Sequence, residues 1–233
     1  MNYYLGGYYF IKLRPVTFGT KLDNVVYTCS DCINDNLVQA WSYSWTIGTN
    51  KETREAKKKF DLDDNKIKAI RNWIDKKHEE NKVGWVDLFT ELGSALEYKR
   101  TFFSHLNDIK IFALYFDEKE ARGLLEEFKP QSEKEGEIGL HHTLSKQITE
   151  TVTDSEKLIG YDFIGIEEGG GFHTFHCHDI GAELSEKFGL TLNSFGLFDN
   201  SNDWKRVLDY MNNEENGCEP VPWFVAKTKL IIE

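Results

Sequence analysis

Two similar segments, beginning at Leu5 and at Leu158, constrain the fold of this chain more than any other feature. LGGYYFIKL (5–13) and LIGYDFIGI (158–166) are identical at five of nine aligned positions. Both are rich in aromatic and aliphatic residues that favour extended backbone, so each predicts a strand. A similar segment in each half of the chain indicates that one supersecondary unit occurs twice.

A second pair of segments follows in the same order. GWVDLFTELGSALEY (84–98) aligns without a gap on GLFDNSNDWKRVLDY (196–210), with Gly, Asp, Leu and Tyr matched. The same offset continues into IKIFA (109–113) and VPWFV (221–225). We therefore expect an α+β fold made of two diverged β-β-α-α-β units, related by internal duplication and packed around a pseudo-twofold axis.

The repeat also predicts how the chain is divided. We expect a first unit over residues 1–116, with an insertion near 14–60, and a second unit over 157–233. Between them, residues 117–156 combine a helical pattern with the charged, turn-rich stretch KPQSEKEGEIG, which is typical of a linker.

Hydrophobic periodicity predicts the individual elements. The expected helices cover 61–82, 93–103, 117–128, 179–189 and 201–212, and the last of these has Ser201 as its N-cap. The expected strands cover 5–13, 41–47, 109–116, 158–166, 172–177 and 221–232. In this scheme WSYSWTI (41–47) and FHTFHC (172–177) are equivalent second strands of the two units.

The stretch GGGFHTFHCHDIG (169–181) contains the densest group of potential ligands: His173, His176, Cys177, His178 and Asp179. In an extended segment His176 and His178 point to the same side, so together they could bind Zn²⁺, with Cys177 or Asp179 completing the site. This reading predicts a metal-binding protein or a metal-dependent hydrolase.

A structural reading of the same residues competes with the metal site. The strand could end near Cys177, and His178 or Asp179 could cap the following helix, while His173 and His176 lie half-buried among phenylalanines. Trp and Ser occupy the corresponding strand 41–47, and a fold that accepts Trp there does not need a metal. We therefore expect no cofactor, and zinc stays open as the alternative.

Cys29 and Cys32 have the spacing of half a zinc site or of a redox pair. A complete zinc site would need further ligands, and only the histidine stretch could supply them from across the fold. No helix clearly begins at Cys32, which argues against a thioredoxin-like motif. We interpret the two cysteines as separate thiols on a loop.

The charge balance restricts the partners. With 39 acidic and 28 basic residues, the net charge of −11 repels nucleic-acid phosphates. The apolar runs are too short to span a membrane, and four cysteines are too few for a disulfide-rich secreted protein. We expect a cytoplasmic protein with free thiols that binds neither nucleic acid nor membranes.

Several segments carry a resemblance: LGGYYFIKL, SWTI, the 84–98 segment, GGGFHTFHCHDI, NSFGLFD and EPVPWF. Together they resemble uncharacterised cytosolic proteins of Gram-positive bacteria, and more loosely the small acidic immunity proteins that neutralise bacterial toxins. The resemblance implies binding and neutralisation of another protein, and it supplies no catalytic residues. Our leading expectation is thus a non-catalytic protein that binds a basic protein partner. A small-molecule sensor with a pocket between the two halves is a further alternative.

Overall fold

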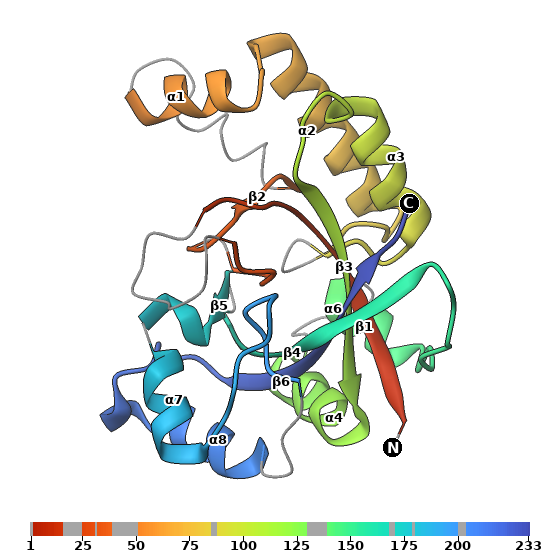
Figure 1. Cartoon of the computed structure of the whole chain (residues 1–233). Helices are drawn as coiled ribbons and strands as arrows, with labels where there is room; N and C mark the ends of the chain where they lie inside the picture. Colours follow the sequence, from red (N-terminus) through yellow and green to blue (C-terminus); the bar gives the residue numbers. More distant parts are fainter. Residues whose placement is uncertain are drawn as a thin grey trace.

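A computed structural model describes residues 2–15, 25–30, 32–38, 51–84, 88–129, 139–167, 171–178, 180–199 and 204–233. Its centre is one curled antiparallel sheet with the strand order β2-β1-β3-β6-β4-β5 (Figure 1). The strands are β1 (Tyr3–Lys12), β2 (Asp35–Asn36), β3 (Ile109–Asp117), β4 (Glu156–Ile166), β5 (Phe172–Thr174) and β6 (Trp223–Ile231). The expected mixed α and β class is confirmed.

One face of the sheet carries two separate helical layers (Figure 1). At one end, α2 (Asp64–Glu79) and α3 (Leu92–Phe102) enclose the core around Phe10. At the other end, α7 (Ile180–Phe188) and α8 (Trp204–Met211) enclose the core around Phe163. A further described helix, α1 (Lys51–Lys59), precedes α2 in the chain.

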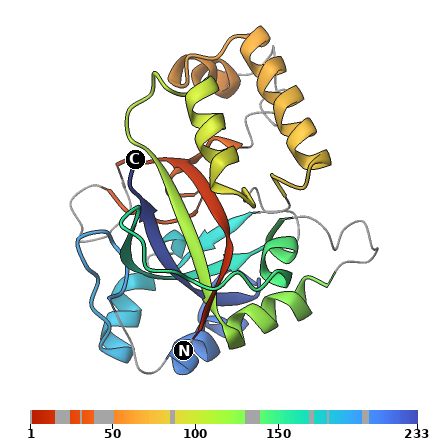
Figure 2. The same ribbon diagram turned by 90° about the vertical axis from the view of Figure 1, so that its right-hand side faces the viewer.

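The opposite face of the sheet is covered by α4 (Glu118–Glu127) and α6 (Gly139–Ser145) (Figure 2). Because side chains alternate along β3, Phe112, Leu114 and Phe116 all point into this third core. Two short 3₁₀ helices complete the described elements, η3 (Phe175–His178) and η4 (Glu214–Asn216).

Short polar side chains fix where helices begin. Asp63 caps α2, since its Oδ1 accepts a hydrogen bond from the Lys66 amide at 2.7 Å. Asp117 caps α4 in the same way through the Glu120 amide at 2.9 Å. Both acids also lie at the positive end of the helix dipole, which adds to their stabilising effect.

Most of the expected elements are confirmed within a few residues, and the main difference lies in the histidine stretch. The strand expected over 172–177 ends at Thr174 and continues as the 3₁₀ helix η3. Thr174, Phe175 and His176 are all buried. In a continuous strand, Phe175 would point to the opposite face of the sheet from Thr174 and His176. The expected strand 41–47 and the cap at Ser201 lie outside the described residues, and the described strand beside β1 there is Asp35–Asn36.

Candidate functional site

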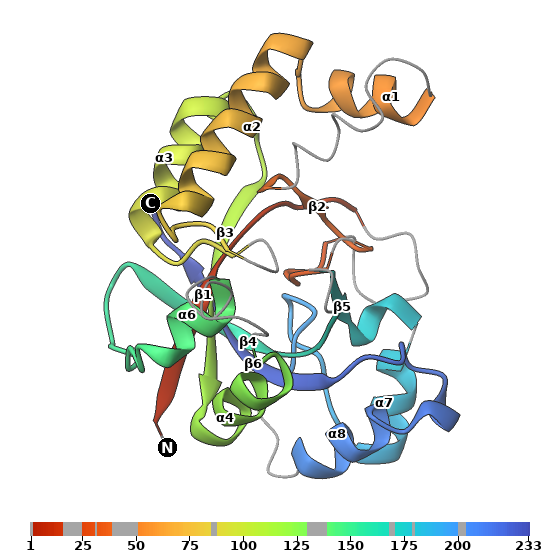
Figure 3. The ribbon, with the colours of Figure 1, turned by 180° about the vertical axis from the view of Figure 1, so that it is seen from behind.

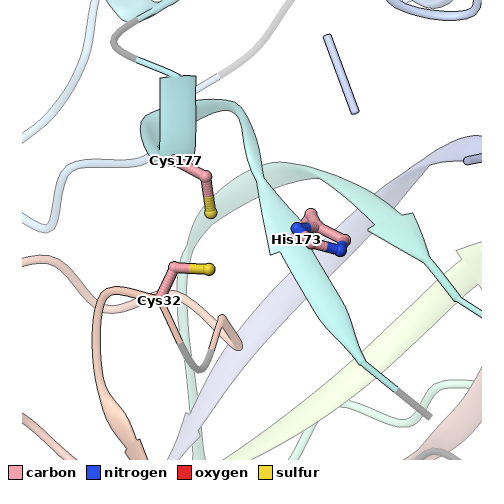
Figure 4. Close-up of side chains that lie close together, drawn as sticks. All are labelled: Cys32, His173 and Cys177. Atoms are coloured by element: carbon pink, nitrogen blue, oxygen red, sulfur yellow. The ribbon is translucent and has the colours of Figure 1, made fainter. Parts of the chain in front are cut away.

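Three potential metal ligands converge at the outer end of β5: Cys32, His173 and Cys177 (Figure 4). One ligand atom of each lies within 4.8 Å of the other two. His173 is on β5, Cys177 is on η3, and Cys32 comes from a turn far away in the sequence. Thiol sulfur and imidazole nitrogen are the ligand types that zinc prefers.

His173 is held in one orientation by an acidic neighbour. Its Nε2 lies 2.8 Å from Oε1 of Glu167, so the Nε2–H group donates a hydrogen bond to this carboxylate. Nδ1 is buried and has no hydrogen-bond partner among the described residues. The carboxylate thus selects the tautomer in which the lone pair of Nδ1 is available to a ligand.

A second acidic side chain, that of Glu219, lies close to the same histidine. Ligand atoms of Glu167, His173 and Glu219 also lie within 4.8 Å of one another. Glu219 is fixed from its backbone, because its carbonyl accepts a hydrogen bond from Nε1 of Trp223 at 3.0 Å. Two carboxylates and two thiols therefore lie within reach of this one imidazole.

Cys177 is half-buried and hydrogen-bonded at its sulfur. The Ser30 hydroxyl lies 3.0 Å from Sγ, and the Thr174 amide donates to Sγ at 3.4 Å. Burial raises the pKa of the Cys177 thiol to about 12, although these two hydrogen bonds act in the opposite direction. A cation bound at this sulfur would lower its pKa and favour the thiolate at neutral pH.

Cys32 lies on a segment that is bonded to β4 and the 193–198 loop at one end and pairs with β1 at the other. We call residues 25–30 and 32–38 the strap. Arg14, just after β1, donates from its guanidinium to the carbonyls of Ile33 and Cys32 and from its backbone amide to Oδ1 of Asn34 at 3.1 Å. The Asn34 amide group in turn donates to two strap carbonyls at 2.8 and 3.0 Å. These bonds fix the turn that carries Cys32.

The other end of the strap is attached to the second half of the sheet, beside β5 and the 193–198 loop (Figure 3). The Tyr27 amide donates to the Phe195 carbonyl at 2.9 Å, and the two rings meet edge to face with centroids 5.0 Å apart. The Thr28 hydroxyl donates a hydrogen bond to the Asp162 carboxylate in β4.

Asp162 is the most deeply buried acid at this end of the sheet, with 1% of its surface exposed. Besides the bond from Thr28, it accepts a hydrogen bond from the Thr174 hydroxyl at 2.8 Å. Loss of solvent raises the pKa of Asp162 to about 7, against the lowering effect of the hydroxyl hydrogen bonds. A titratable group therefore joins the strap, β4 and β5.

The remaining predicted ligands are placed differently. His176 is buried and donates from Nε2 to the Gly196 carbonyl at 2.7 Å, so it belongs to the core beside Phe175. The side chain of His178 and all of Asp179 lie outside the described residues. The fold thus joins His173 and Cys177 of the predicted cluster with Cys32, Glu167 and Glu219.

The sequence contained a partial signal for Cys32. The Cys29–Cys32 spacing suggested half a zinc site, and the histidine stretch was the expected source of further ligands. Only one of the two cysteines reaches that stretch, because Cys29 is buried in the third core. No sequence pattern pointed to Glu167 or Glu219.

Two cavities bear on the sensor alternative. A cavity of about 530 Å³ lies at the start of α4, lined by Asn2, Asp117 and Arg122 among others. A smaller one of about 220 Å³ lies between the end of α8 and the 219–222 loop. Neither cavity is lined by residues from both the α2/α3 layer and the α7/α8 layer.

In the described part of the chain, no helix is long and apolar enough to cross a membrane. All four cysteines, which are all described, are free thiols. Comparison of the chain with protein-family models, with curated proteins and with solved structures gave no match.

Proposed function

We propose that this protein binds a divalent metal ion of the zinc class through Cys32, His173 and Cys177. The observation that carries the proposal is the convergence of these two sulfurs and one imidazole, from three separate segments, within 4.8 Å. Two thiols and an imidazole form a donor set typical of zinc, whereas magnesium and calcium prefer oxygen ligands.

The surroundings of the three ligands support the same proposal. A zinc-bound histidine commonly donates its other ring N–H to a carboxylate, and Glu167 accepts such a bond from His173 at 2.8 Å. Hydrogen bonds from Ser30 and the Thr174 amide favour the thiolate form of Cys177, which is the form that binds metal. Three protein ligands leave one tetrahedral position for water or for another ligand, which is also the arrangement of a hydrolytic zinc site.

The test is metal analysis of protein purified without an affinity tag and incubated with Zn²⁺. We expect about one equivalent of zinc per chain after removal of excess metal, and loss of this zinc in a Cys32→Ser, Cys177→Ser double variant. Cys218→Ser is the matched control, because Cys218 is buried in the separate core beneath α8. A wild-type protein without stoichiometric zinc, or equal zinc in the double variant, would rule the site out.

We further propose that the fold arose by duplication of a β-β-α-α-β unit, with a pseudo-twofold axis at the centre of the sheet. The strand order supports this, since β2-β1-β3 is followed by β6-β4-β5. Gly7 in β1 and Gly160 in β4 both form a bulge, with φ of +146° and +143°. Their partners across the sheet, Leu114 and Thr228, are paired with each other, as an axis at this point requires.

Backbone hydrogen bonds next to the two glycines support the same correspondence. Tyr8 exchanges two hydrogen bonds with Phe89, and Tyr161 exchanges two with Phe198. These hydrogen bonds make Phe89 equivalent to Phe198, whereas the gapless alignment of 84–98 on 196–210 does not align these two residues. In this scheme β2 corresponds to β5, so the metal ligand His173 belongs to the second unit only.

A second candidate function is binding of another protein in the cytoplasm, in the immunity-like role that the resemblance to Gram-positive proteins implies. The charge of −11 favours a basic partner. The most exposed large apolar side chains among the described residues are Ile148, Val152, Leu158 and Ile232. They lie on the segment that enters β4 and on the adjacent chain end, where the Ile232 amide donates to the Ser155 carbonyl at 2.8 Å.

Affinity capture from the native host with wild-type protein and a Val152→Glu variant tests this second function. Val152 is fully exposed, so the substitution leaves the core unchanged. We expect a basic protein that is retained by the wild type and lost with the variant. Equal recovery with both proteins would argue against a partner at this surface.

A further inference from the structure

We propose that Cys32 and Cys177 form a redox-sensitive pair, in which a peroxide-class oxidant converts the two metal-bound thiolates into a disulfide and releases the metal ion. The release of metal rests on the zinc site proposed above. The disulfide step rests only on the positions of the two sulfur atoms, so the two parts can fail separately.

The four cysteines differ in their access to an oxidant. Cys32 is exposed on the strap, and its Sγ lies within 4.8 Å of Sγ of the half-buried Cys177 (Figure 4). Cys29 and Cys218 are buried in two different cores, on opposite faces of the sheet. An oxidant in solution therefore meets Cys32 first, and Cys177 is the neighbour placed to react with the product.

The chemistry balances with hydrogen peroxide as the oxidant. The Cys32 thiolate attacks one peroxide oxygen, the O–O bond breaks, and with one proton the products are a sulfenic acid and water. The Cys177 thiolate then attacks the sulfenic sulfur, the S–O bond breaks, and with a second proton the products are a disulfide and water. The two sulfurs lose two electrons, which reduce the peroxide, and the zinc ion keeps its charge.

Formation of the disulfide removes the metal because it removes two of three protein ligands. His173 alone is a weak site, so zinc leaves once both thiolates are consumed. The fold survives this change, since the strap stays attached to β4 and to the 193–198 loop through Thr28 and Tyr27. Before oxidation the metal ion links the strap to η3, and after oxidation the disulfide links the same two segments.

The experiment is a titration of zinc-loaded, tag-free protein with hydrogen peroxide. Zinc release is followed with a chromogenic chelator, and disulfides are located by peptide mapping without reduction. We expect one zinc released for each Cys32–Cys177 disulfide formed, and renewed zinc binding after treatment with a reductant. Zinc retention at full peroxide consumption, or zinc loss with Cys32 and Cys177 unlinked, would overturn the proposal.

Two variants separate the steps. In Cys177→Ser, we expect Cys32 to stop at the sulfenic acid, detected by a dimedone-type probe, and no disulfide to form. Cys32→Ser changes an exposed side chain and is expected to fold normally, so peroxide should leave its Cys177 unlinked. If the reduced wild type binds no zinc, the proposed function fails, and mapping of the peroxide-treated metal-free protein still decides whether Cys32 and Cys177 pair. A disulfide that involves Cys29 or Cys218 instead would refute the pair.

Discussion

Replacement of Asp162 by Asn tests whether the buried carboxyl group controls stability in the way its surroundings indicate. Asp162 is buried between the strap and the sheet and accepts hydrogen bonds from the Thr28 and Thr174 hydroxyls. Asn has almost the same shape and can hydrogen-bond both hydroxyls, because its oxygen accepts and its amino group donates. The substitution therefore removes the titration and keeps the packing.

The magnitude follows from the pKa. Burial raises the pKa of Asp162 from 3.8 to about 7, so between these values the folded protein holds a proton that the unfolded chain has lost. The folded state binds more protons, and its stability must fall as the pH rises through this window. Three pH units at about 1.4 kcal/mol each give a loss of up to about 4 kcal/mol, complete at about pH 8.

The assay is urea unfolding, followed by tryptophan fluorescence, of the wild type and Asp162→Asn between about pH 5 and about pH 8. Other groups titrate equally in both proteins, so the difference between their unfolding free energies isolates residue 162. We expect this difference to shift in favour of the variant by a few kcal/mol as the pH rises. Asp154→Asn, at an exposed position, is the matched control for net charge. A difference that stays constant across this range would show that folding does not raise the pKa of the Asp162 carboxyl group.

Four further substitutions test stability and metal affinity. Gly160→Ala should lower the free energy of unfolding by about 2 kcal/mol or more, because φ is +143° and the new Cβ would lie 2.6 Å from Cβ of Leu197. Gly93→Ala, in α3 with open space around the new methyl group, should raise the free energy of unfolding by up to about 1 kcal/mol in the same urea assay. Glu167→Ala should weaken zinc binding about 10- to 100-fold in competition with a chelator, since His173 loses its orienting carboxylate, and an unchanged affinity would contradict that role. Phe10→Ala should cost about 3–5 kcal/mol of unfolding free energy by thermal or urea unfolding, because the ring is fully buried among other aromatic side chains; a loss below about 1 kcal/mol would contradict its place in that core.

Most of the local structure of this protein can be read from its sequence. The aromatic and aliphatic runs at 5–13 and 158–166 predicted β1 and β4, and hydrophobic periodicity predicted the helix over 61–82. The structure shows that Ile67, Ile70 and Ile74 form the buried face of this helix, α2. These elements depend on alternation or on helical periodicity, which is written in neighbouring residues. The same local rules located the histidine stretch as the place most suited to ligand chemistry.

Which residues of the histidine stretch face one another depends on the tertiary structure. The sequence suggested His176 and His178 as the metal pair on the assumption of a continuous strand, but burial of Phe175 and His176 turns the chain into a 3₁₀ helix after Thr174. His176 then hydrogen-bonds in the core, and Cys177 points toward His173 and Cys32.

Cys32 joins the site through contacts that no local pattern contains. Arg14 fixes its turn, and Asp162 in β4 holds the strap against the second half of the sheet, with more than a hundred residues between the two sides. Long-range placement of this kind depends on the sum of burial and hydrogen bonding across the whole fold. The residue types that can bind a metal are therefore readable from the sequence, whereas their combination into one site is a property of the folded chain.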